Sequence, residues 1–288
     1  MWELLIRGVD FYHLINWFFI YSFFGWLWET CFVSLKNGKY VNRGFINGPF
    51  CTIYGFGALS VYLILKPVSD SILCLFFGGI VVATALEYVT AVLMESIFHT
   101  SWWDYSDNKF NFQGRICLGV SLGWGVLTLF LFRVLHPAVE KLVSLYPVNV
   151  GKIAVCVISV GYLVDFVYSA AAAFKLHERI PVIEQAVEQA RDELLLKMHE
   201  HLKSVSFTKD ATLETVKERL GDVEVLKDLE ERRAALMTEL TAEVERRKKA
   251  AAAKLGHNIS RFVNSYPNLN RGYKLRKHRK EKDNKKNA

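Results

Sequence analysis

Long apolar stretches constrain the fold of this chain more than any other feature. Five of them are close to the roughly 20 residues that a helix needs to cross a hydrocarbon core of about 30 Å. A soluble protein of 288 residues does not contain five such runs. The sequence therefore predicts an all-α fold, a polytopic membrane bundle of about five transmembrane helices within residues 1–174, at about 12–35, 49–65, 71–94, 116–135 and 153–174.

Glycine and proline residues indicate where these helices begin and where they pack closely. Pro49 suits the first turn of the second helix, where its missing N–H has no cost. The second stretch is the shortest, and it contains Gly55. Gly119 and Gly123 in the fourth stretch have the small-xxx-small spacing of close helix contacts. The first stretch is expected to remain uncleaved, because residues 1–10 are too short and too charged for the apolar part of a signal peptide.

Charge divides the chain at about residue 175. Residues 1–174 have no net charge, so the net charge of +7 lies in the second part. Apolar residues recur at spacings of three, four and seven within 175–256, which predicts cytoplasmic amphipathic helices there. A hairpin with a turn at 204–212 is the first interpretation, and a dimeric coiled coil is the second. Helices that lie solvated beneath the membrane are a third.

Residues 257–288 form a strongly basic tail. Its end, 271–286, cannot build a core and is predicted to be disordered. Basic residues near a membrane surface attract anionic lipid headgroups by about 1 kcal/mol each. RNA would be attracted by the same charges, but no RNA-recognition module accompanies them. We therefore expect the bilayer, with anionic headgroups at this tail, to be its partner, and we do not expect a nucleic acid.

Three carboxylates lie inside the apolar stretches, namely Glu29 in the first, Glu87 in the third and Asp165 in the fifth. Each is in the C-terminal half of an odd-numbered span, so all three are expected in one leaflet. A charged residue inside a span costs about 2.5–3.5 kcal/mol on insertion scales and usually faces a partner or a wet cavity. The three acids predict a polar site that opens to one side. The alternative is a polar cluster that only fixes helix packing.

Two loops on the side of the tail, 36–48 and 95–115, carry arginines that could neutralise these acids. Arg43 follows the span of Glu29, and Arg115 follows the span of Glu87. We predict that Glu29 and Glu87 pair with Arg43 and Arg115. The alternative is that the arginines bind headgroups or extend to the interface. Three aromatic residues of the second loop are typical of an interfacial belt; they are Trp102, Trp103 and Tyr105.

The basic residues that follow the last span favour a cytoplasmic tail. The loops carry equal numbers of basic residues on the two sides, so they do not decide the orientation. Lys175, Arg179 and Arg191 lie within about 20 residues of the last span, and the positive-inside rule counts residues in this zone. With five spans, the N-terminus is then expected outside.

Three strings resemble the signature stretches of a bacterial membrane family labelled "putative ABC-transporter permease, CmpB type". They are GWLWET (25–30), NRGFINGPFCTIYGFG (42–57) and WWDYSDNKFNFQGRICL (102–118), and NSYPNLN (264–270) is similar to a short motif near the C-terminus of such proteins. The resemblance implies a multi-pass protein of the bacterial plasma membrane.

The resemblance also emphasises particular positions. Those with ionisable or amide side chains, together with Asp165, make up the candidate polar site: Glu29, Asn42, Arg43, Glu87, Asp104, Asn111, Arg115 and Asp165. The remaining emphasised positions are expected to shape the structure: Gly44, Gly48, Pro49, Tyr54, Gly55, Trp103, Tyr105 and Gly114.

No catalytic or metal-binding pattern accompanies these residues in the sequence. There is no Walker A string, so the chain does not power transport by its own ATP hydrolysis. The sequence also has no Ser-His-Asp or Cys-His grouping and no HExxH motif. Its five scattered cysteines indicate apolar packing. We expect neither an enzyme nor a cofactor or metal.

The leading hypothesis is a permease-like component whose inward-facing polar site binds a solute or ion. A separate ATPase or a soluble cytoplasmic partner would then dock on the tail. The alternative is a membrane scaffold or regulator that recruits a partner through its cytoplasmic helices. An enzyme that acts on lipids is a third reading, and a homo-oligomer remains open.

Overall fold

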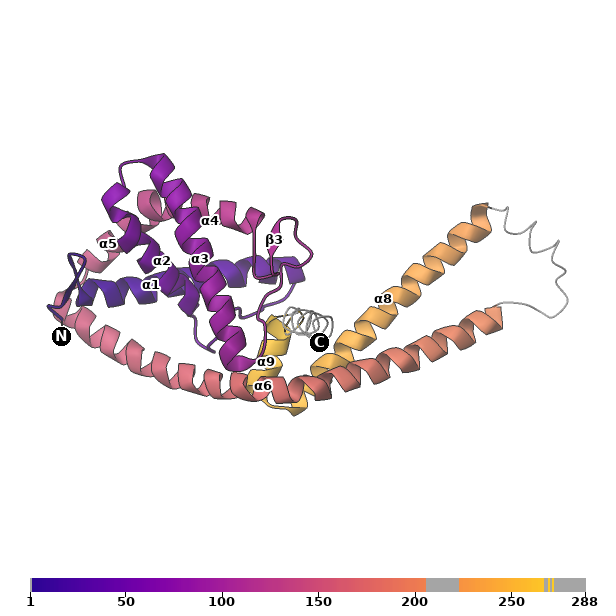
Figure 1. The fold of residues 1–288 in the computed structure, drawn as a ribbon. Coiled ribbons are helices and arrows are strands. Elements are labelled where there is room, and N and C mark those ends of the chain that lie inside the picture. Colours follow the sequence, from indigo (N-terminus) through magenta and orange to yellow (C-terminus); the bar gives the residue numbers. More distant parts are fainter. Residues whose placement is uncertain (1, 206–222, 267–268, 270, 272–288) are drawn as a thin grey trace, which may run out of the picture. The chain divides into compact units, whose positions relative to one another are not determined.

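Helices form most of the chain in a computed structural model, which describes residues 2–205, 223–266, 269 and 271. The chain divides into two compact units. One comprises Met1–His177 together with Arg261–Ala288, and the other comprises Glu178–Ser260. Figure 1 shows the helices of each unit. The predicted all-α membrane bundle is confirmed.

Four helices among the described residues are long and apolar enough to cross a membrane. They are α1 (Phe11–Asn37), α3 (Ile72–Phe98), the continuous helix Leu118–Ser144, and Val148–Leu176. The third comprises α4 (Leu118–Phe130), the π-helical turn η2 (Leu131–Leu135) and α5 (His136–Ser144). The fourth is the first half of α6 (Val148–Val205). Each of these four helices covers all or nearly all of one predicted span.

The second predicted span, 49–65, is shifted by three residues toward the C-terminus, to Thr52–Val68. Helix α2 (Thr52–Leu65) continues only into a short 3-10 turn, η1 (Lys66–Val68). Thr52–Val68 is therefore a short apolar helix beside the four full-length candidates. The helix begins after Pro49, because residues 47–51 remain in the preceding loop, where the backbone N–H of Cys51 donates to the Ser22 carbonyl at 2.8 Å. The prediction that Pro49 occupies the first helical turn was wrong.

Glycines allow two pairs of helices in the first unit to pack closely. A side chain at Gly25 of α1 would overlap Tyr54 of α2, and one at Gly55 would come within 2.8 Å of the Phe18 carbonyl oxygen. Between α3 and α4, a side chain at Gly79 would overlap Thr128. Gly119 and Gly123, which the sequence favoured for this role, have no atom of the described chain within 4 Å of an added Cβ. The close contact with α3 is therefore made further along α4.

Two short hairpins connect to these helices. Strands β1 (Leu5–Ile6) and β2 (Val9–Asp10) pair antiparallel before α1. The segment between α3 and α4 is called the second inner loop. In it, β3 (Asn111–Phe112) pairs with β4 (Ile116–Cys117), with Asn111 opposite Cys117. The fourth span therefore begins at Leu118, two residues later than predicted, because residues 116 and 117 are held in the hairpin.

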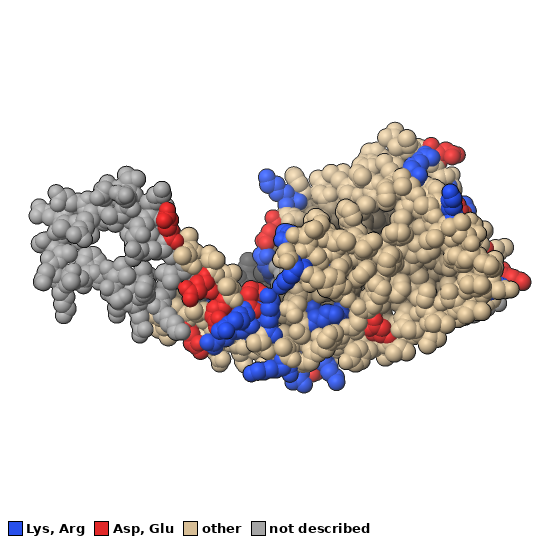
Figure 2. Space-filling model, turned by 180° about the vertical axis from the view of Figure 1, so that it is seen from behind, with Lys and Arg blue, Asp and Glu red and all other residues tan. Residues whose placement is uncertain are grey.

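The surface of the first unit is mainly apolar. Figure 2 shows a broad face with few charged side chains, which gather toward its ends. Long apolar side chains such as Phe77, Val81 and Val164 are more than half exposed on α3 and α6. Contiguous apolar surface of this extent marks a face that contacts lipid. This face agrees with the membrane assignment from hydropathy.

The second unit contains the continuation of α6 and helix α8 (Val223–Lys254), which run in opposite directions (Figure 1). Arg247 of α8 pairs with Glu193 of α6 at 2.7 Å, and Ile183, Ala190 and Ala252 are buried. The turn predicted at 204–212 and the basic end at 271–286 lie almost wholly outside the described residues. Helix α9 (His257–Ser265) follows α8.

Candidate functional site

Glu29 of α1 lies at the centre of the first polar cluster. Nε of Arg43 is 3.4 Å from Oε2 of Glu29, and the hydroxyl of Tyr54 donates to Oε1 at 2.8 Å. The Glu29 and Arg43 side chains are 29% and 20% exposed, so water is partly excluded from the pair. The expected ion pair is therefore present, and Tyr54 adds a hydrogen bond to the other carboxylate oxygen of Glu29.

Glu87 of α3 forms a second cluster without an arginine. Its carboxylate accepts hydrogen bonds at 3.0 Å from the hydroxyl of Tyr105 and from the indole Nε1 of Trp124. Glu87 is 5% exposed. Tyr105, which was expected in an interfacial belt, thus points to a buried acid instead. Burial raises the pKa of Tyr105, and the Glu87 carboxylate raises it further, so the phenol remains a hydrogen-bond donor.

Arg115 pairs with Glu95 instead of Glu87. Its Nη2 and Nε lie 2.6 Å and 3.1 Å from Oε2 of Glu95. The predicted pairing of Arg115 with Glu87 was wrong. Arg115 sits in the β3–β4 hairpin, which reaches the end of α3 near Glu95, whereas Glu87 lies two helical turns earlier. Reasoning from the sequence missed Glu95, although its spacing of eight residues from Glu87 places both acids on one helix face.

Asp165 of α6 holds the segment between α1 and α2, which is called the first inner loop. It accepts hydrogen bonds from the backbone N–H groups of Asn47 at 3.1 Å and Gly48 at 2.7 Å, and from the Asn47 side chain at 2.8 Å. Ser169 adds a fourth at 3.3 Å. A side chain at Gly48 would lie 3.3 Å from the same carboxylate. Asp165 therefore binds loop backbone, and it does not share partners with Glu29 or Glu87.

Asn42 shapes the first inner loop from within. Its side-chain oxygen accepts from Trp26 Nε1 at 2.8 Å and from the Gly44 backbone at 3.0 Å, and its amide donates to the Asn47 carbonyl at 2.8 Å. A side chain at Gly44 would press on the Phe50 carbonyl oxygen at 3.0 Å. These contacts fix the loop and use both polar atoms of the Asn42 side chain.

The second inner loop is fixed in the same way. Asn111 donates to the Asn108 carbonyl at 2.8 Å and accepts from the Gly114 backbone at 3.1 Å, where Gly114 has a φ of +67°. Asp104 accepts from Ser106, and the Trp103 indole donates to the Arg115 carbonyl at 3.0 Å. Asn42, Asp104 and Asn111 of the predicted polar site therefore organise loops.

The segment Arg261–Tyr266 packs on the first inner loop. Arg261 donates to the backbone carbonyls of Gly44, Phe45 and Ile46 at 2.6, 2.6 and 3.1 Å. Phe262 is fully buried, and its ring lies 5.8 Å from the Phe45 ring and 4.9 Å from the Trp102 ring. The described start of the predicted basic tail is thus a packed helix.

Arg43 connects this C-terminal segment to the Glu29 cluster. Its guanidinium also donates to the Ser265 carbonyl and lies 4.5 Å from the centre of the Tyr266 ring. The Tyr266 hydroxyl donates to the Arg43 carbonyl at 2.8 Å. The apolar spacing Phe262, Val263 and Tyr266 was the signal in the sequence that could have identified this segment.

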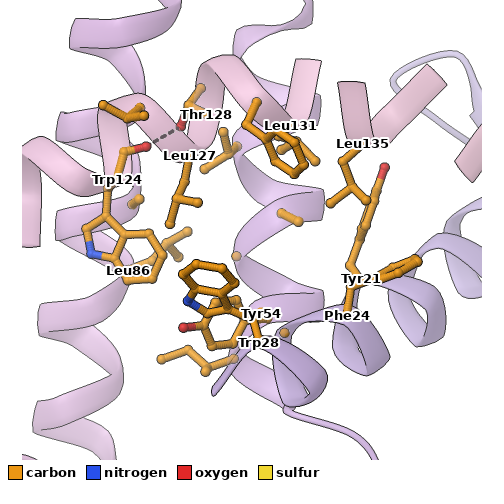
Figure 3. A pocket seen from close by; sticks show the side chains of 18 of the residues that line it. Tyr21, Phe24, Trp28, Tyr54, Leu86, Trp124, Leu127, Thr128, Leu131 and Leu135 are labelled. Atoms are coloured by element: carbon orange, nitrogen blue, oxygen red, sulfur yellow. Dashed lines mark hydrogen bonds between the residues drawn. The ribbon is translucent and has the colours of Figure 1, made fainter. Parts of the chain in front are cut away.

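A cavity of about 650 Å³ lies between α1, α2, α3 and the α4–α5 helix (Figure 3). This volume is within the range of about 300–1,000 Å³ that is typical of ligand pockets. Tyr21 and Leu135 line one end and Trp124 and Leu86 the other, while Trp28 and Tyr54 lie between them (Figure 3). Glu87 also lines the cavity, next to Trp124.

The clusters of Glu29 and Glu87 meet beside this cavity. Tyr54, which binds Glu29, and Trp124, which binds Glu87, have ring centres 6.0 Å apart. The structure therefore brings together two of the three predicted acids, through their aromatic partners. Within the described ranges, no three His, Cys, Asp or Glu side chains are grouped closely enough to hold a metal ion.

Comparison with known proteins agrees with the resemblance in the sequence strings. No curated protein matches the chain, and no solved structure does. A family model matches residues 16–170, from α1 into the first half of α6, and so includes both acid clusters and both inner loops. Because this match covers more than half of the chain, the protein belongs to the family described as "Putative ABC-transporter type IV".

Proposed function

We propose that this membrane protein is a permease-like component of a transporter, and that Glu87 is its ligand-binding acid. The observation that carries the proposal is the position of Glu87, a 5% exposed carboxylate that lines the cavity. Its hydrogen-bond donors among the described residues are both neutral, Tyr105 and Trp124. Buried charges in membrane segments usually mark the path of a substrate or ion.

The other acids are less suited to this role because their charges are already compensated. Glu29 forms an ion pair with Arg43, and Glu95 forms one with Arg115. Asp165 accepts three hydrogen bonds from the first inner loop and a fourth from Ser169 of its own helix. An arginine close to a carboxylate stabilises its charge and fixes its geometry. We therefore assign these three pairs or clusters a positioning role around the cavity.

The proposal includes an orientation and an energy source. The tail would be cytoplasmic in a bacterial plasma membrane, which places the inner loops and both acid clusters toward the cytoplasm. The chain has no Walker A string, so ATP hydrolysis would come from a separate subunit. The helices of Glu178–Ser260 form a compact unit of their own, and this unit is the proposed docking element.

Complementation with a charge-removing variant tests the proposal. Glu87→Gln keeps the side-chain shape and removes the negative charge, so it should fail to restore whatever function is lost in a deletion strain. Asp70→Asn is the matched control, because Asp70 is exposed in the connection before α3. Both variants should reach wild-type abundance in the membrane. Full complementation by Glu87→Gln would remove the basis for the proposal.

A scaffold or regulator is the second candidate function, and the separate helical unit favours it. Glu178–Ser260 could recruit a soluble protein without any transport by the membrane unit. Purification in mild detergent separates the two candidates. Co-purification of an ATPase subunit supports the permease, whereas a soluble partner without ATPase activity supports the scaffold.

A further inference from the structure

We infer that the cavity between α1, α2, α3 and α4 binds a lipophilic organic cation, with Glu87 as its counter-ion. The inference rests on the proposed function and names the substrate class of the same site. It combines three observations: the chemistry of the lining, the charge of Glu87, and the side on which the cavity opens.

The lining selects an apolar ligand. Aliphatic and aromatic side chains from four helices make up nearly all of the cavity surface, including Leu86, Leu127 and Leu131 (Figure 3). Burial of an apolar ligand in such a cavity is favourable by roughly 25 cal/mol per Å² when the ligand comes from water. A hydrated ion or a sugar would lose its water in this cavity and would find few polar partners in return.

The charge selects a cation. Among the described residues that line the cavity, Glu87 is the only Asp, Glu, Lys or Arg. Its two hydrogen bonds come from neutral groups, Tyr105 and Trp124, so they orient the carboxylate without cancelling its charge. A neutral acyl chain could fill the apolar part but would leave the ionised form of this buried carboxylate without a positive partner. A cationic ligand supplies the missing charge.

Aromatic rings strengthen the preference for a cation. Trp28, Tyr54 and Trp124 all line the cavity, and Tyr54 and Trp124 are neighbours with ring centres 6.0 Å apart. The faces of such rings attract cations, by about 2 kcal/mol or more where water is excluded. Trp124 also donates to Glu87, so the carboxylate and the rings can contact the same cation.

The cavity opens toward the lipid side of the bundle. Trp28, Val126 and Phe130 line it, yet 62%, 59% and 48% of their surfaces are exposed. These residues lie within spans α1 and α4, where exposed surface contacts hydrocarbon. A ligand that partitions into the bilayer reaches the cavity directly, which favours a lipophilic cation over a hydrophilic amine.

Binding of tetraphenylphosphonium to the full chain in phosphatidylcholine nanodiscs tests the inference. Empty nanodiscs report the non-specific partitioning, which is subtracted. Wild type should show a saturable component. Glu87→Gln should weaken this component by at least about tenfold, because one buried ion-pair partner is lost. Triphenylphosphine oxide, a neutral compound that keeps three of the four phenyl rings, should bind weakly and with equal affinity to wild type and Glu87→Gln.

A pair of glycine variants locates the site. Gly57 lines the cavity, and an added Cβ meets no atom of the described chain within 4 Å, so Gly57→Leu adds apolar bulk at the cavity wall. It should reduce saturable binding by at least about tenfold. Gly161→Leu is the matched control, since Gly161 is equally open and lies outside the cavity lining. It should bind like wild type.

The results separate this inference from the proposed function. Absence of saturable binding by wild type, or equal binding by wild type and Glu87→Gln, would overturn the cationic ligand class. If Glu87→Gln still fails in complementation, the proposed function survives such a result. Equal loss of binding in Gly57→Leu and Gly161→Leu would contradict the location of the site.

Discussion

Arg261 donates a hydrogen bond from Nη2 to the carbonyl oxygen of Phe45 at 2.6 Å, across a separation of 216 residues. The same guanidinium binds the carbonyls of Gly44 and Ile46. Burial lowers the pKa of Arg261, and the three carbonyls compensate for the lost hydration of its charge. The contact links the segment Arg261–Tyr266 to the loop that also carries Arg43.

Arg261→Gln should therefore destabilise the membrane unit. The shorter neutral side chain cannot reach three carbonyls, and each buried group left without a partner costs about 1–3 kcal/mol. We expect a lower midpoint of thermal unfolding in detergent. Arg246→Gln is the control, because Arg246 is 76% exposed, and it should unfold like wild type. Equal midpoints for the two variants would contradict the role of Arg261.

Truncations should separate the packed part of the tail from its basic end. Deletion of residues 272–288 should leave insertion and unfolding as in wild type, because this segment has no apolar periodicity with which to build a core. Deletion from residue 261 onward also removes the fully buried Phe262, whose loss alone costs about 3–5 kcal/mol in a typical core. Detergent thermal unfolding of both truncations checks this. A similar loss in both would place the stabilising contacts beyond Arg271.

Arg43→Ala should lower membrane abundance more than Glu29→Gln does. Loss of Arg43 leaves the Glu29 carboxylate without its positive partner and also removes the contacts to Ser265 and Tyr266. Glu29→Gln keeps an acceptor for the Tyr54 hydroxyl, which lies 2.8 Å away. Quantitative immunoblots of membrane fractions measure the difference. A double variant that is more abundant than Arg43→Ala alone would confirm that the unpaired charge causes the loss.

Gly55→Ala should destabilise the contact between α1 and α2. The added methyl group would come within 2.8 Å of the Phe18 carbonyl oxygen and would overlap Ser22. Overpacking of this kind costs typically about 1–3 kcal/mol. Gly123→Ala makes the same chemical change in α4 where no atom lies within 4 Å, so its unfolding midpoint should match or exceed that of wild type. Equal destabilisation by both would contradict the packing argument, because replacing Gly by Ala raises helix propensity at both positions.

Reporter fusions test the orientation. A reporter after Lys286 should report cytoplasm, and one in the connection 66–70 should report the opposite side, because basic residues after the last span favour the cytoplasm. The reverse pattern would place both acid clusters toward the outside.

The helical membrane domain was predictable from hydropathy and periodicity. Four spans were recognisable because a helix satisfies its own backbone hydrogen bonds in lipid. The length of an apolar stretch is therefore enough to identify a membrane-spanning helix. The pairing of Glu29 with Arg43 also followed from the sequence, since one short loop separates them. Even the second helix was found, and only its start was misplaced, because the Asn47–Gly48 backbone is held by Asp165 of a distant helix.

Tertiary structure alone decided which groups meet over long separations. Hydropathy did not predict that Arg115 pairs with Glu95. It also did not predict that Tyr105 and Trp124 donate hydrogen bonds to Glu87, or that Arg261 binds the first inner loop. Those contacts depend on how loops fold back against helix ends, and local spacing does not encode this. The cavity is likewise a property of four packed helices together, because its volume is the space that their side chains leave between them.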